Sequence, residues 1–328
     1  MHTMLFEPAY QYDIIKDEEF SSKIVEITDI LNQYVNRGYF TSFDDKKMYY
    51  EFFKVTNPAA SIIIVHGYTE FTKKYYELTW YFMKMGYNVF LYDVRGHGYS
   101  HRHNDDLELT HVDRYEDYVS DLDSYIKQIV IPNSEGKPLY LFGQSMGGTI
   151  AQMYIAGGEN TIQKTVLSAP MIYPYTPPLP KFVIKKLLAN EARKFGWDGR
   201  FKFSSDFNPE IKIEKSNDLS LARFQYNLQT RIKDLKYRNS YGSNRWTYEA
   251  VSAIEKILNK KAAKKVQSKV FIVIAGQDTA VNPKHQIKLA RLLNCEYKIF
   301  EKSKHSLYTM PDCELQRYVD ALLKFYAE

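Results

Sequence analysis

The chain has 328 residues, of which 45% are hydrophobic and 25% charged, and a formal net charge of +5 at pH 7, which matches an ordinary globular protein with a substantial core. No stretch approaches the roughly 20 apolar residues that span a bilayer, and the N-terminus lacks the basic and apolar segments of a secretory signal. The two cysteines, Cys295 and Cys313, provide neither a disulfide framework nor a metal-ligand cluster, so we expect a cytoplasmic protein without a bound metal.

Short β-forming runs alternate with amphipathic stretches of helical length, which is typical of a parallel sheet with crossover helices. The predicted strands cover residues 39–43, 48–55, 61–65, 87–92, 138–142, 164–168, 269–275 and 297–300, and the first two form a hairpin. The predicted helices cover residues 73–85, 115–129, 148 to about 156, 283–293 and 313–326. The sequence therefore predicts an α/β fold with a mostly parallel sheet and helices on both faces.

Residues 171–241 interrupt this alternation. Five of the 12 prolines fall between positions 170 and 180, and helical fragments broken by glycine and proline follow. A long insertion after a strand, over the crevice where open α/β sheets bind ligands, is typical of a cap or lid. We expect a core formed by residues 1–170 and 242–328 and a helical cap formed by residues 171–241.

The hexapeptide Gly-Gln-Ser-Met-Gly-Gly at residues 143–148 directly follows a predicted strand and precedes a predicted helix. That context is required of a G-x-S-x-G nucleophile elbow, a strained turn that exposes a serine hydroxyl. A Cβ at Gly143 or Gly147 would collide with neighbouring backbone in so tight a turn. The pattern predicts Ser145 as a nucleophile; the alternative is a chance glycine-rich turn between a strand and a helix.

A carboxylate and a histidine follow Ser145 along the chain, each after a predicted strand. Asp278 follows residues 269–275, where it can accept a hydrogen bond from an imidazole, although capping of the next helix is an alternative role. His305 is the one histidine that follows Asp278 on a loop after a strand, since His2 is terminal, five others precede Ser145 and His285 lies within a predicted helix. The order predicts a Ser145, Asp278, His305 triad, in a chain order unlike that of chymotrypsin or subtilisin.

Two backbone N–H groups are candidates for an oxyanion hole. Such an elbow pairs the N–H of the residue after the serine with an N–H from the loop that follows an earlier strand, here residues 61–65. Those groups belong to Met146 and Tyr68. We expect His66 to be a structural histidine that ties this loop down, because the chemistry needs the backbone there.

A second ordered loop follows the predicted strand 87–92. Its residues 93–100 alternate glycines with Arg and His. Asp93 follows a strand, as a triad acid would, but it precedes Ser145. We interpret Asp93 and Arg95 as structural residues that form a buried pair.

With these motifs the chain resembles the lysophospholipase and monoacylglycerol lipase branch of the α/β-hydrolases. The matching pieces are HGYTE (66–70), DVRGHGYS (93–100), GQSMGG (143–148), LSAPM (167–171), GQD (276–278) and KHSLY (304–308). The resemblance covers the core from about residue 39 to the C-terminus and is weakest through the cap. It implies hydrolysis of a single ester bond to a long acyl chain, so the expected partner is a lipid ester substrate, and it implies no metal and no organic cofactor.

The expected cap is the basic part of the chain, since residues 181–236 contain 13 Lys and Arg against 7 Asp and Glu. A lysophospholipid, or an anionic bilayer that holds it, would benefit from this charge, whereas a neutral monoacylglycerol would not. Apolar cap residues could line an acyl tunnel or enter the interface; they include Phe182, Val183, Ile184, Leu187, Leu188, Phe195 and Trp197. Two interpretations of the cap stay open: it contacts a membrane surface peripherally, or its Lys and Arg residues only solvate the outer faces of the cap helices while the apolar residues pack inward. No block of like charge suggests a nucleic-acid partner.

Two other classes of function stay open. The same machinery serves general carboxylesterases and aminopeptidases that act on N-terminal proline, although the latter usually carry Trp where this chain has Met146. A non-catalytic binding protein that keeps the fold is the second class, and it is disfavoured because all three triad residues are present.

Overall fold

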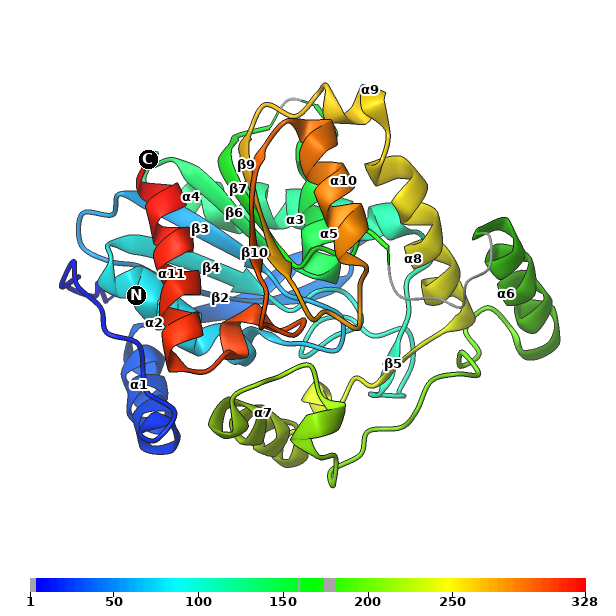
Figure 1. Ribbon diagram of the computed structural model, residues 1–328, viewed down its shortest axis with the longest axis horizontal. Helices are drawn as coiled ribbons and strands as arrows, with labels where there is room; N and C mark the ends of the chain where they lie inside the picture. Colours follow the sequence, from blue (N-terminus) through cyan, green and yellow to red (C-terminus); the bar gives the residue numbers. More distant parts are fainter. Residues whose placement is uncertain (1–3, 159, 174–180) are drawn as a thin grey trace.

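The computed structural model describes residues 4–158, 160–173 and 181–328. Its centre is an eight-stranded sheet with the order β1-β2-β4-β3-β6-β7-β9-β10 (Figure 1). The strands are β1 (Asn36–Thr41), β2 (Lys47–Phe53), β3 (Ala60–Val65), β4 (Tyr87–Tyr92), β6 (Leu139–Gln144), β7 (Ile162–Ser168), β9 (Lys269–Ala275) and β10 (Glu296–Phe300). β2 is antiparallel to both of its neighbours, and the other neighbouring pairs are parallel, so the predicted sheet is confirmed.

Helices cover both faces of this sheet, as predicted. The longer ones are α1 (Phe20–Tyr34), α2 (Tyr76–Lys84), α3 (Tyr115–Tyr125), α5 (Met146–Ile155), α8 (Asn244–Ile257), α10 (Pro283–Leu293) and α11 (Asp312–Ala327). Side chains of β3 alternate between two cores: Ile62 and Ile64 pack with α1, α2 and α11, whereas Ile63 and Val65 pack with α3, α5, α8 and α10. Continuous burial of β3, β4 and β6 explains why these strands are mostly apolar.

The helices α1 and α8 were not predicted, and two of the predicted helices differ in their course. Residues 73–85 begin with a 3₁₀ turn, η1 (Thr72–Tyr75), before α2. Residues 115–129 form α3 and then a π-helical turn, η2 (Ile126–Val130), which leads into α4 (Ile131–Asn133). A π turn adds one residue to the helical repeat and cannot be read from an amphipathic pattern.

The stretch between β7 and α8 contains α6 (Lys181–Phe195) and α7 (Leu221–Lys233), with short turns η3 (Ile213–Lys215) and η4 (Leu235–Tyr237). α6 packs against α8, and α7 packs against α1, at the edge of the molecule (Figure 1). The chain returns through β8 (Tyr241–Gly242), which pairs with β5 (Leu109–Thr110). The remaining short helices are α9 (Lys260–Ala263) and η5 (Leu307–Thr309). Across the described ranges, no helix combines the length and the apolar character needed to cross a bilayer.

The strand order changes direction at β3. The chain runs outward from β3 to β4 and then resumes on the other side of β3 with β6. Loops at the carboxyl ends of β3 and β6 therefore diverge and leave a crevice, which is where open α/β sheets bind ligands. Ser145 and Tyr68 both follow strands at this crevice.

Candidate active site

Ser145 occupies a strained turn between β6 and α5. Its backbone has φ +52° and ψ −114°, outside the usual regions for a residue with a Cβ. The N–H of Ser145 donates to the carbonyl of Ser168 at 2.9 Å, and the N–H of Met171 donates to the carbonyl of Ser145 at 2.9 Å. These bonds hold the turn from both sides. The strained backbone of Ser145 and the hydrogen bonds that hold it are typical of a nucleophile elbow.

The flanking glycines are required by close backbone contacts. A Cβ on Gly147 would lie 2.0 Å from the carbonyl oxygen of Val65, and one on Gly143 would lie 2.6 Å from the carbonyl oxygen of Gly147. Both obstacles are backbone atoms, which cannot rotate away. The steric reason inferred from the sequence for these two glycines is confirmed.

The structure brings the three predicted triad residues together. The Nε2 atom of His305 lies 2.8 Å from Oγ of Ser145, and its Nδ1 atom lies 2.7 Å from Oδ2 of Asp278. All three side chains are buried, with 8%, 4% and 8% of Ser145, Asp278 and His305 exposed. Asp278 follows β9 and His305 follows β10, whereas Ser145 follows β6. Residues far apart in the sequence thus form one hydrogen-bonded chain.

Neighbouring groups fix the orientation of the acid and the histidine. The other carboxylate oxygen of Asp278, Oδ1, accepts the N–H groups of Ala280 at 2.8 Å and Val281 at 3.0 Å. The Nε2 amide of Gln144 donates to the carbonyl of His305 at 3.1 Å. Because Gln144 directly precedes Ser145, this bond ties the histidine loop to the elbow. The sequence interpretation did not identify this role for Gln144.

The loop after β3 lies beside the serine, and a buried carboxylate holds it. A Cβ on Gly67 would lie 3.3 Å from Cβ of Ser145. The N–H of Gly67 donates to Oε2 of Glu70 at 2.7 Å, and Glu70 also accepts hydrogen bonds from Lys74 and from the hydroxyls of Tyr75 and Tyr308. Burial alone would raise the pKa of Glu70, but the Lys74 ammonium and these hydroxyls outweigh it and lower that pKa to about 2.

His66 is confirmed as a residue that ties down the loop. Its Nε2 atom accepts the N–H of Val94 at 2.8 Å, and its Nδ1 atom lies 2.8 Å from the carbonyl oxygen of Gly67. Burial lowers the pKa of His66 to about 4, so the ring is neutral and can donate on one side and accept on the other.

The interpretation of Asp93 and Arg95 as a buried pair is wrong. Arg95 forms its ion pairs with Asp44 at 2.7 Å and Asp121 at 2.6 Å. Asp93 instead accepts the N–H groups of Thr72 and Tyr99, each at 2.9 Å. Because Asp93 and Arg95 are two residues apart in a tight turn, their side chains contact different neighbours. Burial raises the pKa of Asp93 to about 7.

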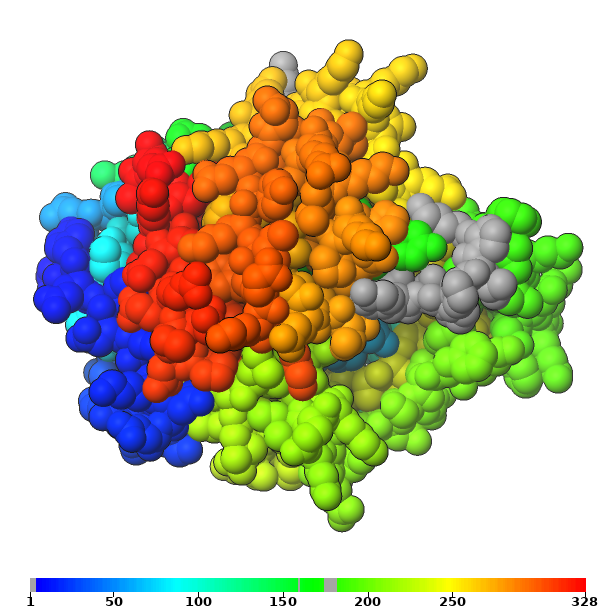
Figure 2. Space-filling view, viewed as in Figure 1, coloured from blue at the N-terminus to red at the C-terminus, as the bar shows by residue number. Residues whose placement is uncertain are grey.

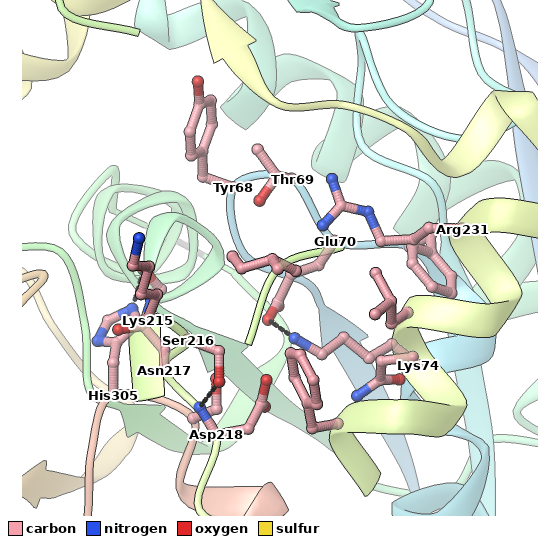
Figure 3. Close-up of a pocket in the computed structure, with 17 residues that line it drawn as sticks. Tyr68, Thr69, Glu70, Lys74, Lys215, Ser216, Asn217, Asp218, Arg231 and His305 are labelled. Atoms are coloured by element: carbon pink, nitrogen blue, oxygen red, sulfur yellow. Dashed lines mark hydrogen bonds and ion pairs between the residues drawn. The ribbon is translucent and has the colours of Figure 1, made fainter. Parts of the chain in front are cut away.

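A polar cavity of about 230 Å³ opens over Ser145 and His305. Its charged lining residues are Glu70, Lys74, Lys215, Asp218 and Arg231. They come from the loop after β3 and the following turn, from the η3 region and from α7, as Figure 3 shows. The last three residues belong to the expected cap, whose divergent sequence gave no reason to single them out.

An apolar groove of about 710 Å³ lies under α6. Its apolar lining includes Met171, Ile184, Leu187, Leu188, Phe201, Phe203, Trp246 and Val251. Tyr68 lines both this groove and the polar cavity, and its ring stacks on that of Trp246 at 4.2 Å between centroids. Figure 2 shows the surface hollowed between the orange residues around β9 and α10 and the yellow-green residues. Of the apolar cap residues singled out in the sequence, Ile184, Leu187 and Leu188 line the groove. Phe182 and Phe195 are exposed and do not line it.

The strand order, the strained serine and its hydrogen-bonded histidine define the class: this is an α/β-hydrolase. Residues 56–312 match the family described as serine aminopeptidase, S33, and the chain belongs to that family.

Several similar proteins are named as lysophospholipases or monoglyceride lipases. The probable lysophospholipase L2 of Haemophilus influenzae is 27% identical over 249 residues, covering 75% of this chain and 77% of that relative. The monoglyceride lipase of Saccharomyces cerevisiae is 26% identical over 295 residues, covering 83% and 86%. A crystal structure of a soluble variant of the yeast enzyme, in complex with a substrate analog, superposes with a TM-score of 0.71 at 22% identity, covering 89% of this chain and 94% of that one.

Proposed function

We propose that this protein is a serine hydrolase that cleaves the carboxylic ester of a single-acyl lipid, a lysophospholipid or a monoacylglycerol, through an acyl-enzyme intermediate. The observation that carries the proposal is the hydrogen-bonded series Ser145, His305 and Asp278. Ser145 and His305 line the polar cavity, and Tyr68 lines both that cavity and the apolar groove. The names of the relatives support the same substrate class.

In the proposed reaction, His305 removes the hydroxyl proton as Ser145 attacks the acyl carbonyl carbon. Nδ1–H of His305 donates to Asp278, so Nε2 is free to accept that proton, and the carboxylate stabilises the imidazolium that forms. The N–H groups of Tyr68 and Met146 stabilise the oxyanion. His305 then protonates the leaving alkoxide, and a water molecule activated by the same histidine releases the fatty acid.

The two cavities divide the substrate between them. The apolar groove suits the acyl chain, because burial of each methylene contributes about 0.8 kcal/mol. The polar cavity suits the alcohol, which leaves first and is replaced by water. Residues 171–241 act as a cap in this proposal, since α6 contributes to the groove and α7 to the cavity.

We also propose that the protein works at the membrane surface without spanning it, from the cytoplasmic side. The basic balance of residues 181–236 would draw the cap to an anionic bilayer, at about 1 kcal/mol for each Lys or Arg near the surface. Co-sedimentation with anionic vesicles that weakens as salt rises is the expected behaviour. Equal binding to neutral vesicles at all salt concentrations would contradict an electrostatic attachment.

A substrate panel tests the proposed function. It contains p-nitrophenyl esters of increasing chain length, lysophosphatidylcholine, 1-monoacylglycerol and proline p-nitroanilide. We expect kcat/KM to rise with acyl length and at least one single-acyl lipid to be cleaved. Activity that does not rise beyond short acyl chains would favour a general carboxylesterase, and cleavage of the anilide alone would favour an aminopeptidase.

A further inference from the structure

Arg231 is a partly buried cation that lines the polar cavity without a carboxylate in contact. Among residues 4–158, 160–173 and 181–328 it forms no ion pair. Its Nε donates to the carbonyl of Tyr237 at 3.1 Å, its Nη2 donates to the carbonyl of Asn239 at 2.5 Å, and its guanidinium lies 4.6 Å from the centroid of the Phe207 ring. Burying a charge without an opposite charge is costly, so the site is one that an anion would stabilise.

Among the described residues, no carboxylate of the cavity forms an ion pair with Arg231, although Asp218 and Glu70 act on it from a distance. Glu70 is already paired with Lys74 at 2.8 Å, and Oδ1 of Asp218 accepts the hydroxyl of Thr309 at 2.8 Å. Burial lowers the pKa of Arg231 to about 10, against the opposing effect of more distant carboxylates, and the guanidinium still stays charged at neutral pH. Lys215, on the same cavity, is exposed and adds a second positive charge.

The guanidinium keeps donors free for a ligand. Figure 3 shows Arg231 extending from α7 toward the loop that carries Thr69 and Glu70, while Asp218 lies away from it. No acceptor for Nη1 is found among the described residues, and one Nη2 hydrogen also remains. Two adjacent N–H groups in one plane match two oxygens of a phosphate, which is the usual geometry of arginine–phosphate recognition.

We infer that Arg231 binds the phosphate of the leaving group, so that this enzyme prefers a lysophospholipid to an uncharged monoacylglycerol of the same acyl chain. The inference rests on the proposed function, because it concerns the alcohol side of the same ester. Free phosphate or glycerol phosphate could bind the same N–H donors of Arg231. The experiment below therefore distinguishes binding of the lipid's phosphate from binding of these free compounds.

The test compares kcat/KM for lysophosphatidic acid, lysophosphatidylcholine and 1-monoacylglycerol of equal acyl length, all below their aggregation concentrations. The variants are Arg231→Gln, Arg231→Lys and the control Arg238→Gln. Arg238 also donates to carbonyls at the end of α7, at 3.1 Å to Arg231 and 2.7 Å to Ile232, but it does not line the cavity. A second measurement is inhibition of p-nitrophenyl ester hydrolysis by inorganic phosphate and by glycerol 3-phosphate.

We expect the ratio of lysophospholipid to monoacylglycerol kcat/KM to fall at least tenfold in Arg231→Gln, partly in Arg231→Lys, and less than twofold in Arg238→Gln. Glycerol 3-phosphate inhibition should weaken in parallel in the Arg231 variants. An unchanged ratio in a folded Arg231→Gln protein overturns the inference, as does inhibition by free phosphate without any effect of Arg231 on the ratio. Failure of wild type to cleave any of the lipids contradicts the proposed function itself, which is a separate outcome.

Discussion

Glu70 shows how one buried carboxylate can position a catalytic loop. It joins the N–H of Gly67 to Lys74 and to the hydroxyls of Tyr75 and Tyr308, so it links the loop after β3 with η1 and η5. The same loop carries the proposed oxyanion donor Tyr68. A charge-assisted bond to a backbone N–H is stronger than a neutral one, so Glu70 keeps this donor oriented before substrate binds.

We predict that Glu70→Gln destabilises the protein in a pH-dependent way. The pKa of Glu70 is lowered to about 2 in the folded protein from its ordinary value of 4.5, so its stabilisation is present above about pH 4.5 and is lost as the pH falls toward 2. The shift corresponds to about 3 kcal/mol at neutral pH. Urea unfolding of both proteins from pH 7 to pH 3 measures it.

The difference in free energy of unfolding between wild type and Glu70→Gln should narrow as the pH falls from 5 to 3. Glu26→Gln is the control, because its exposed pair with Lys23 on α1 contributes little. A difference that stays constant over this range would show that the ionised form of Glu70 has no special role.

At the scale of single residues, the sequence predicted those positions whose chemistry depends on local context. Ser145 lies in a motif of adjacent residues, and Asp278 and His305 each lie in the loop that follows a strand. Glu70 and Arg231 were not predicted as site residues. Glu70 has a partner far along the chain, Tyr308, and Arg231 reaches the site only because α7 lines the cavity over Ser145. Arg95 was assigned the wrong partner, since Asp121 lies in α3.

At the scale of elements, α6 forms one wall of the apolar groove through Ile184, Leu187 and Leu188. We predict that Leu187→Asp reduces the ratio of long-chain to short-chain ester kcat/KM at least tenfold, because a carboxylate would be placed against the acyl chain. The measurement is the chain-length series of p-nitrophenyl esters at monomeric concentrations.

Leu221→Asp is the matched control for this prediction. Leu221 is 52% exposed at the start of α7 and lines neither cavity, whereas Leu187 is 49% exposed. The control should keep the wild-type ratio. Equal ratios for Leu187→Asp and wild type would mean that the acyl chain does not occupy the groove.

Helices whose ends are marked by capping residues in the sequence were predicted as helices, with nearly correct first and last residues. α10 matches its predicted residues 283–293, since Asn282 caps it, Pro283 opens it and Asn294 ends it in a left-handed conformation. By contrast α1 was missed, although Phe20, Ile24, Ile27 and Leu31 recur at helical spacing and are buried. The helical spacing of these four apolar residues could have predicted α1. The course of α6 and α7 depends on packing against α8 and α1, which no local pattern reveals.

At the scale of the whole molecule, Arg223 connects α7 to the core. Its side chain is 2% exposed, pairs with Glu77 of α2 at 2.6 Å and with Asp17, and donates to the carbonyl of Ile15 at 2.7 Å. It thus joins the N-terminal segment, α2 and the helix that carries Arg231. Such a buried network is sensitive to loss of one partner, which leaves the others without compensation.

We predict that Arg223→Ala lowers the free energy of unfolding by about 3–5 kcal/mol, measured by urea denaturation. Arg193→Ala on the surface of α6 should change it by less than about 0.5 kcal/mol. A double-mutant cycle with Glu77→Ala should show that the two losses are strongly non-additive. Additive losses would mean that the pair does not act as a unit.

Ser145 is the proposed nucleophile of an acyl-transfer reaction. Labelling with a fluorophosphonate probe, followed by mass spectrometry of the intact protein and its peptides, tests this role most directly. We expect one probe adduct per wild-type chain, located on Ser145, and no adduct on Ser145→Ala. An unlabelled wild-type protein, or equal labelling of the Ser145→Ala variant, would contradict it.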